Sequence, residues 1–198
     1  MTTQDQGKFT ETDLRYLGRT VELAVEALEA GDAPFGSILV YHGPANDAND
    51  EEVKTFVRED RNRIATMGDE TRHPEFELAR WAASNLASAE QRRAATVYTS
   101  GEHCAMCAAA HAWAGLGEIV YVASSRQLEG WAREFKREAN QGEEEGRGVL
   151  GPIATLPVQT VAPFTPVRGP VPDSGSGGLI ERIRKLHWRY FERMSSST

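Results

Sequence analysis

The sequence has few cysteines, no long apolar run and no excess of basic residues. Only two of its 198 residues are cysteine, and they lie too close together to staple a fold, so an oxidised, secreted protein is not indicated. No apolar run approaches the roughly 18 residues of a membrane span, and the first residues lack the basic start and apolar segment of a secretory signal. We therefore expect a cytoplasmic protein with reduced thiols and no membrane partner.

Acidic residues outnumber basic ones. The chain has 29 aspartate and glutamate residues against 22 lysine and arginine residues, which gives a formal net charge of −7 at pH 7. Because phosphate binding depends on clustered lysine and arginine, nucleic acid is not an expected partner. The basic segment at residues 181–193 is interpreted as an amphipathic helix that turns its apolar residues inward, in preference to a membrane or RNA contact.

The spacing of apolar residues alternates along the chain between a helical period and a strand period. Helices are predicted over residues 11–30, 74–89, 104–116, 126–139 and 181–193. Strands are predicted over residues 36–43, 52–59, 95–100, 118–124 and 153–161. A polar, turn-rich segment joins the first two strands, which are expected to form a hairpin. Strands alternating with helices predict a three-layer α/β/α sandwich around a mixed sheet of about five strands.

The length and the hydrophobic content of 40% fit a single globular domain. Residues 1–161 contain every predicted strand and form its main part. Residues 162–178 are rich in proline, glycine and serine, so residues 162–198 are interpreted as a linker followed by the C-terminal amphipathic helix. We expect this helix to pack on the same domain or on a partner subunit.

Both cysteines lie where a predicted strand passes into a predicted helix. Cys104 and Cys107 are three positions apart in a first helical turn and can direct both sulfurs to one point. The free N–H groups of a helix start also favour thiolates. A C-x-x-C motif at such a junction is compatible with a thioredoxin-like dithiol, a structural zinc site or a catalytic metal site. These alternatives demand different residues elsewhere in the chain.

His73 favours the catalytic metal site. A catalytic zinc takes three protein ligands and a water, and His73 lies 31 residues before Cys104, at the start of another predicted helix. Glu75 follows two residues later, and a glutamate in that place has no part in dithiol chemistry. A structural zinc would need a fourth protein ligand, which His103 and His111 are poorly placed to supply.

An H-x-E motif followed by a C-x-x-C motif is the signature of the zinc deaminases. With these motifs the sequence resembles the cytidine deaminase-like superfamily, and within it the guanine deaminase and nucleoside deaminase branch. The resemblance covers roughly residues 11 to 125. It rests on the segments DAPFGSILV at 32–40, RNRIATMGDETRHPE at 61–75 and VYTSGEHCAMCAAAHAWAGLGEIVYVAS at 97–124. These segments follow the order of the family's PFGA, asparagine-then-HAE and EPCPMC motifs.

The resemblance implies roles for individual residues. It makes residues 1–161 a zinc deaminase catalytic domain that holds one Zn2+ ion. The implied zinc ligands are His73, Cys104 and Cys107, and the implied catalytic proton carrier is Glu75. The side chains implied to bind the substrate are Phe35, Asn62, His111 and Trp113.

Two positions in the motifs differ from the family pattern. His103 stands where relatives have proline, and Pro74 stands between His73 and Glu75 where relatives have alanine or glycine. In relatives the backbone N–H at this second position donates to the bound ring, and proline has no N–H. One recognition bond is therefore expected to be missing, and a preference for guanine does not follow from the resemblance.

The sequence predicts a zinc-dependent aminohydrolase that removes the amino group of a small heterocycle and releases ammonia. The expected substrate is a free nucleobase of guanine or cytosine type, and the family implies a homodimer. The alternatives are a deaminase of other amino-heterocycles such as pterins, triazines or base analogues, a tRNA adenosine deaminase, and a non-catalytic zinc-stabilised binding domain. The net charge of −7 speaks against the tRNA alternative.

Overall fold

The computed structural model describes residues 9–44, 53–139, 151–173 and 175–196 of the chain. The strands are β1 (Gly36–Pro44), β2 (Val53–Arg61), β3 (Thr96–Gly101), β4 (Ile119–Ala123) and β5 (Val167–Arg168). The helices are α1 (Glu11–Ala30), α2 (Ile64–Met67), α3 (Pro74–Asn85), α4 (Ala89–Ala94), α5 (Ala105–Ala114), α6 (Ser125–Glu138), α7 (Val158–Val161) and α8 (Leu179–Ser195). Among these described helices, none has the length and apolar character needed to cross a membrane.

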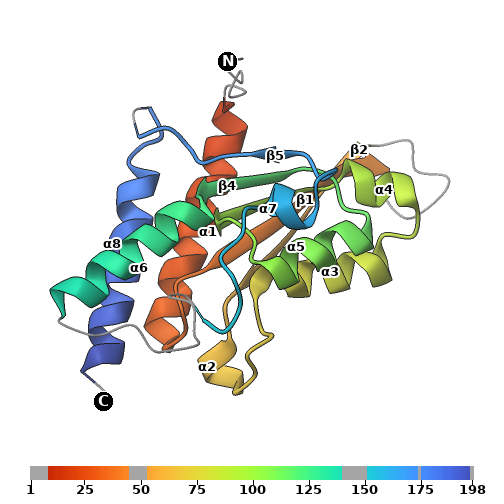
Figure 1. The fold of residues 1–198 in the computed structure, drawn as a ribbon. Helices are drawn as coiled ribbons and strands as arrows, with labels where there is room; N and C mark the ends of the chain where they lie inside the picture. Colours follow the sequence, from red (N-terminus) through yellow and green to blue (C-terminus); the bar gives the residue numbers. More distant parts are fainter. Residues whose placement is uncertain (1–8, 45–52, 140–150, 174, 197–198) are drawn as a thin grey trace.

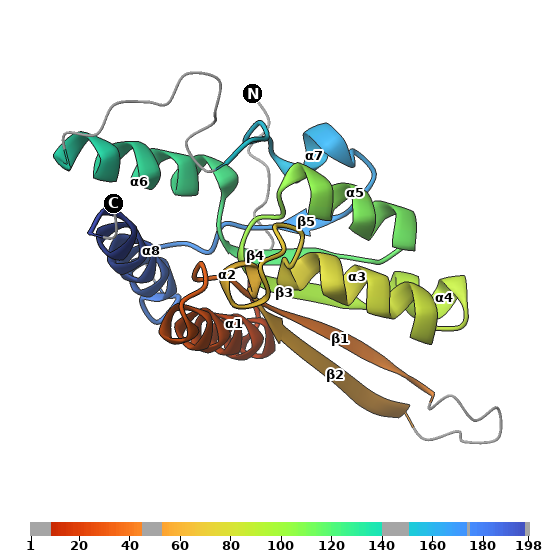
Figure 2. The ribbon, with the colours of Figure 1, turned by 90° about the horizontal axis from the view of Figure 1, so that it is seen from below.

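The strands form one mixed sheet in the order β2-β1-β3-β4-β5 (Figure 1). β1 pairs antiparallel with both β2 and β3, whereas β3 pairs parallel with β4 and β4 pairs parallel with β5. Figure 2 shows α1 and α8 on one side of the sheet and α3 and α5 on the other. The predicted sandwich with a mixed sheet of five strands is therefore confirmed, although most of the turn predicted between the first two strands lies outside the described residues.

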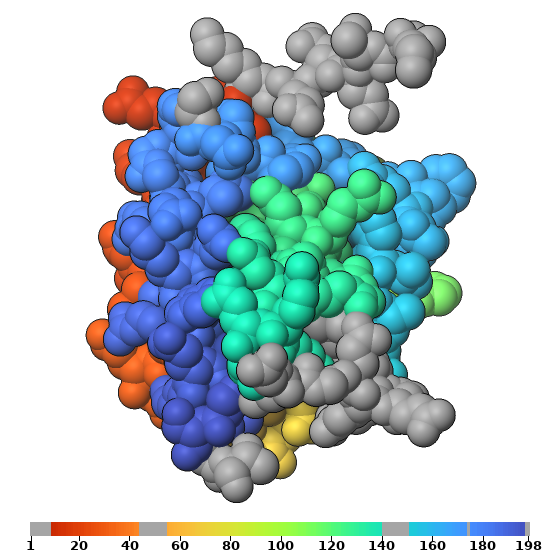
Figure 3. Space-filling model, turned by 60° about the vertical axis from the view of Figure 1, so that its left-hand side comes forward, coloured from red at the N-terminus to blue at the C-terminus, as the bar shows by residue number. Residues whose placement is uncertain are grey.

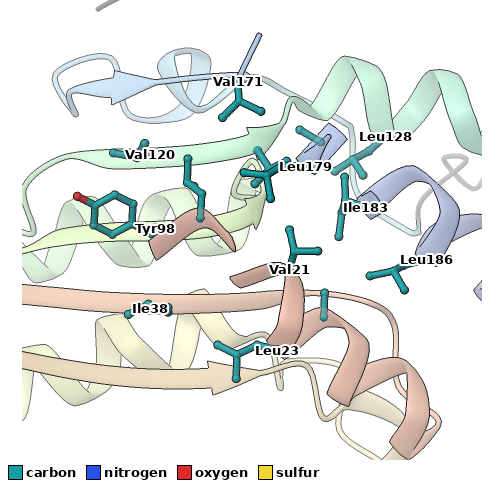
Figure 4. Close-up of a cluster of buried hydrophobic side chains, with 14 of the residues drawn as sticks. Val21, Leu23, Ile38, Tyr98, Val120, Leu128, Val171, Leu179, Ile183 and Leu186 are labelled. Atoms are coloured by element: carbon teal, nitrogen blue, oxygen red, sulfur yellow. The ribbon is translucent and has the colours of Figure 1, made fainter. Parts of the chain in front are cut away.

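Apolar side chains fill the space on both faces of the sheet. On one face, Val21 of α1 and Ile183 of α8 belong to a buried cluster that also includes Ile38 of β1 (Figure 4). On the other face, Leu78 of α3 packs in a second cluster with Leu39 of β1. Each such side chain stabilises the fold by about 1.5–3 kcal/mol when fully buried. The central strands are thus packed against helices on both faces, which fixes the positions of the residues at their ends.

The strand predicted over residues 153–161 is wrong. This segment is irregular and ends in the short helix α7, because Pro157 lacks the N–H that a central strand must donate. The fifth strand is instead the two-residue β5, which lies within the segment predicted to be a linker. Arg168 of β5 is held by ion pairs of 2.8 Å to Asp13 of α1 and 2.8 Å to Glu118.

The C-terminal helix α8 is amphipathic, as predicted, and packs on its own chain. The residues buried along it are Leu179, Ile183, Leu186 and His187. Figure 3 shows α8 beside α6, where the Arg184 guanidinium pairs with the Glu134 carboxylate at 2.9 Å. Arg193 donates to the backbone carbonyl of Leu28 in α1 at 2.8 Å. These contacts fix α8 against α1 and α6 along its length.

Candidate active site

The helices α3 and α5 pack against each other on one face of the sheet, and the residue that precedes each of them belongs to the candidate motif (Figure 2). His73 is the N-cap of α3 and Cys104 is the N-cap of α5, and both have extended backbone with ψ of 136° and 171°. Neither side chain caps its own helix, so both can turn towards a shared ligand. Pro74 suits the first position of α3, because the N–H that it lacks would have no partner within the helix.

The imidazole of His73 and the thiols of Cys104 and Cys107 converge. One donor atom from each of the three residues lies within 4.8 Å of the other two, and Cys104 Sγ is 3.8 Å from His73 Nδ1. Zinc–sulfur bonds of about 2.3 Å and zinc–nitrogen bonds of about 2.1 Å in a tetrahedron place the ligand atoms about 3.6–3.8 Å apart. The donor set therefore fits zinc in type and spacing. Among the described residues it is the one group of three such side chains with this spacing.

Among these groups, the negative charge of Cys104 favours a metal cation. A hydrogen bond from the Cys107 thiol lowers the pKa of Cys104 to about 4, with a further contribution from His73. The same hydrogen bond, together with burial, raises the pKa of Cys107 well above its usual value. Burial works against the charged form of His73, but the hydrogen bond to Cys104 and the charge of Glu75 raise its pKa. A thiolate at this helix start is the form that binds a metal ion.

Glu75 lies beside the three candidate ligands and is not one of them. Its side chain occupies the first turn of α3 and is buried, with 5% of its surface exposed. Its Oε2 lies 3.7 Å from Cys107 Sγ, and burial raises its pKa. A carboxyl group that is held close to a metal site and shifted towards the protonated form can act as a general acid and base.

Phe35 directly precedes β1 and Asn62 directly follows β2, so both lie at the same edge of the sheet. Asn62 follows β2, is 1% exposed, and its backbone N–H donates to the Phe35 carbonyl at 3.0 Å. Its Oδ1 accepts from the Ile64 N–H at 3.1 Å, which leaves its Nδ2 group to contact a ligand. The Phe35 ring is half-buried, and its edge meets the ring of His187 in α8 with centroids 4.9 Å apart. The Phe35 ring therefore packs against the C-terminal helix α8 of the same chain.

Asp32 holds the Asn62 loop in place, a role that the sequence patterns do not indicate. Its buried carboxylate accepts hydrogen bonds from the backbone and the hydroxyl of Thr66, both at 2.9 Å, and from Arg61 at 2.9 Å. Arg61 also donates to the Asn62 carbonyl at 2.9 Å. Burial opposes the charged form, but the hydrogen bonds from Thr66 and Arg61 lower the pKa of Asp32. The loop is thus anchored to an ionised carboxylate.

The side chain of Trp113 is 91% exposed in the single chain, so its contact with a substrate stays a prediction. Trp113 lies six positions after Cys107 in α5, and at about 100° per residue this spacing points the two side chains in different directions. His111, four positions after Cys107, is fully buried. Its Nε2 donates to the Gly117 carbonyl at 2.9 Å. This bond gives His111 a part in the packing of α5, and its contact with a substrate stays a prediction.

Two further buried residues precede Cys104. The Glu102 carboxylate accepts from the Ser125 N–H at 2.7 Å and from the Val158 N–H at 2.9 Å, so it ties the cysteine loop to the starts of α6 and α7. His103 is buried against His111 with ring centroids 5.3 Å apart. Burial lowers the pKa of His103 well below its usual value, so the imidazole is neutral. The loop that carries Cys104 is thus held by Glu102, whereas both ring nitrogens of His103 have no hydrogen-bond partner among the described residues.

Comparisons with known proteins give one relative named as a cytosine deaminase and one named as a guanine deaminase. No protein family model matches the chain. A Schizosaccharomyces pombe protein named "Probable cytosine deaminase" is 28% identical over 173 residues, which are 85% of this chain and 94% of that protein. The guanine deaminase of Bacillus subtilis is 34% identical over 109 residues, which are 54% of this chain and 62% of that protein.

The solved structures give the same fold. The guanine deaminase from Nitrosomonas europaea matches this structure with a TM-score of 0.55 and 17% sequence identity, over 90% of this chain and 84% of that one. At this identity the likeness concerns the fold, which in both chains is a mixed sheet between layers of helices. Both sequence relatives are named deaminases and the fold is shared with a guanine deaminase, so the chain is similar to deaminases of the cytidine deaminase-like fold.

Proposed function

We propose that this protein is a zinc-dependent aminohydrolase that converts an amino group on a nucleobase ring into a carbonyl group and releases ammonia. The observation that carries the proposal is the position of Glu75, whose Oε2 lies 3.7 Å from Cys107 Sγ, beside three donors that fit a zinc ion. The relatives named cytosine deaminase and guanine deaminase support a free nucleobase as the substrate.

His73, Cys104 and Cys107 would hold the zinc ion, which when bound there would polarise the attacking water as a Lewis acid. Glu75, whose Oε2 lies 3.7 Å from Cys107 Sγ, is placed to hold the attacking water by a hydrogen bond. Cys104 contributes negative charge, because its low pKa of about 4 favours the thiolate at neutral pH. The donor set thus gives the site its charge and its geometry.

Glu75 moves the protons of the reaction. Its carboxylate takes one proton from the attacking water and passes it to the ring nitrogen next to the reacting carbon. It then takes the second proton and gives it to the departing amine. The water oxygen becomes the carbonyl oxygen of the product, the carbon–nitrogen bond to the amino group breaks, and ammonia leaves. Because burial raises the pKa of Glu75, the carboxyl group can hold a proton between these transfers.

Phe35 and Asn62 are proposed to bind the ring. The flat face of Phe35 offers a surface on which an aromatic heterocycle can stack, and the Nδ2 group of Asn62 offers a hydrogen-bond donor. Pro74 removes a second donor, because the N–H at the first position of α3 would have no partner in the helix and would face the site. Stacking discriminates little among flat rings, so we propose that the enzyme accepts several aminated bases without a clear preference for guanine.

Replacing Pro74 by alanine is expected to improve catalysis on bases that carry a hydrogen-bond acceptor at the matching position. The restored N–H adds one hydrogen bond, and kcat/KM should rise by about two- to tenfold. The measurement is kcat/KM for guanine, cytosine and several analogues with both proteins. Pro163→Ala, at an exposed position after α7, is the matched control and should change none of these values. A wild-type protein that is strongly selective for guanine, with Pro74→Ala no better on any base, would contradict this explanation of specificity.

The direct test of the proposal is ammonia release by the zinc-loaded protein from a panel of aminated purines, pyrimidines, pterins and triazines. Turnover of one or more free bases, absent in Glu75→Gln, would support the proposal. A zinc-replete protein that is inert towards the whole panel would favour a zinc-stabilised binding domain. Conversion of adenosine in a tRNA without any activity on free bases would favour a tRNA deaminase.

A homodimer in the cytoplasm is also part of the proposal, by analogy with the superfamily. The side chains of Trp113 and Phe164 are 91% and 96% exposed in the single chain, and large exposed aromatic rings are often covered by a partner. Sedimentation equilibrium of the purified protein at micromolar concentration is expected to give the mass of a dimer. A monomer that keeps full activity would remove the dimer from the proposal.

A further inference from the structure

Two hydroxyl groups lie on the sheet directly beneath Glu75. Ser37 of β1 and Thr99 of β3 are register partners in the antiparallel pair of these strands, so their side chains share one face of the sheet. Both residues are fully buried. Leu39 and Val97, two residues further along the same strands, face the same way and pack in the apolar cluster under α3. The face therefore changes from apolar to polar at the point where it meets Glu75.

The two hydroxyls contact one oxygen of Glu75. Ser37 Oγ and Thr99 Oγ1 each lie 3.0 Å from Glu75 Oε1, and they lie 2.9 Å from each other. Thr99 Oγ1 also lies 3.0 Å from the Gly101 carbonyl oxygen. A buried hydroxyl without a partner is costly, and the Glu75 carboxylate supplies a strong acceptor to both. The hydroxyls in turn fix the rotation of the carboxylate about its last bond.

The two oxygens of Glu75 are therefore in different surroundings. Oε1 accepts from the hydroxyls, whereas Oε2 faces the candidate metal ligands, 3.7 Å from Cys107 Sγ. Each hydroxyl has a single hydrogen to donate, and Oε1 can accept it whether or not Oε2 carries a proton. The hydrogen bonds at Oε1 can thus persist when a proton arrives at Oε2 and when it leaves.

We propose that Ser37 and Thr99 are positioning residues that hold Oε1 of Glu75 and restrict proton transfer to Oε2. This inference rests on the proposed deaminase function. The proton of the attacking water goes to Oε2, and the same oxygen delivers it to the ring nitrogen and serves the departing amine. Without the hydroxyls the carboxylate would rotate among several orientations, of which only some direct an oxygen at the reacting atoms.

The test removes the hydroxyls one at a time. Ser37→Ala and Thr99→Val should each lower kcat by about tenfold, and the double variant by about 100-fold, with KM changed less than about twofold. Thr99→Ser keeps the hydroxyl and should stay within about threefold of the wild-type kcat. Zinc content should remain that of the wild type in every variant, because neither residue is a candidate ligand. Loss of activity through KM or zinc content alone would overturn the positioning role.

Thr20→Val is the matched control. Thr20 is a fully buried threonine in α1, and its hydroxyl donates to the Leu17 carbonyl at 2.7 Å, on the other side of the sheet from Glu75. This variant should lose stability while kcat stays unchanged. A fall in kcat in Thr20→Val equal to that in Thr99→Val would show that burial of any threonine matters and would overturn the inference.

A crystal structure of the Ser37→Ala/Thr99→Val variant separates this inference from the proposed function. The Glu75 carboxylate should rotate or occupy more than one orientation, compared with a single orientation in the wild type. An unchanged carboxylate would overturn the positioning role even if the protein proves to be a deaminase. A wild-type protein that deaminates no base would instead overturn the proposed function, and the crystal structures would still decide whether the hydroxyls hold Glu75.

Discussion

Glu75→Gln is expected to stop deamination almost completely while the protein keeps its fold and its zinc. Glutamine has the same shape, and its amide oxygen can still accept from Ser37 and Thr99, both of which contact Oε1 at 3.0 Å. An amide does not carry a proton from water to a ring at neutral pH, so the general acid and base is lost. The expected fall in kcat is about 10²–10⁴-fold. Steady-state ammonia release and metal analysis of the same sample measure the two quantities.

Glu77→Gln is the matched control for this variant. Glu77 lies two residues further along α3, and its carboxylate pairs with Arg80 at 2.7 Å and with Arg72 at 3.4 Å, away from the three candidate ligands. A partly exposed ion pair contributes little to stability, so Glu77→Gln should retain nearly full activity. If Glu77→Gln were inactive and Glu75→Gln active, the proton carrier would have been assigned to the wrong residue.

The sequence predicts the metal site because its candidate ligands lie in two short motifs. Cys104 and Cys107 lie within one helical turn, and His73 starts the helix that packs against it, so two helix starts suffice to bring the three donors together. The spacing of Glu75 after His73 then places the carboxylate in the same helical turn. The meeting of the two helix starts depends on the packing of α3 against α5, which the family resemblance implies.

Whether the residues of α5 predicted to bind the substrate can reach it depends on the orientation of the helix, which the sequence motif does not specify. Trp113 fits the family motif, but its position on α5 turns it to solvent. The helical period itself could have shown this, since Cys107 and Trp113 do not share a helix face. His111 does share the face of Cys107, and its Nε2 donates to the Gly117 carbonyl while its Nδ1 has no hydrogen-bond partner in the described part of the chain.

The residues that the sequence does not reveal act through contacts between distant segments. Asp32 reaches Thr66 across 34 positions and Ser37 reaches Glu75 across 38, and single polar residues of this kind produce no pattern. A serine and a threonine in otherwise apolar strands are a weak signal, because buried hydroxyls are common there. The strand β5 has only two residues, too few for alternation to show, whereas the apolar run at 153–161 suggests a strand that Pro157 prevents.

Replacing any of the three candidate ligands is expected to have a large effect on zinc content and on stability. The wild-type protein is expected to contain about one zinc ion per chain, and His73→Ala, Cys104→Ala and Cys107→Ala should each lose most of it. A metal that binds only the folded state at 1,000 times its dissociation constant stabilises that state by about 4 kcal/mol. For a chain of this length that energy corresponds to a change in Tm of about 8–16 °C. Metal analysis and thermal unfolding, with and without a chelator, measure zinc content and stability.

His42→Ala is the control for His73→Ala, because it removes a histidine that is not a candidate zinc ligand. His42 is exposed near the end of β1, where its Nδ1 lies 3.0 Å from Thr55 Oγ1, five residues beyond Ser37, the β1 residue that contacts Glu75. This variant should keep its zinc. Its Tm should fall on addition of a chelator by as much as the Tm of the wild type does. The three ligand variants should instead unfold at nearly the same temperature with and without chelator, because they have little zinc to lose. Zinc near one equivalent in all three would place the metal elsewhere, and Glu75 would then have no activated water from which to take a proton.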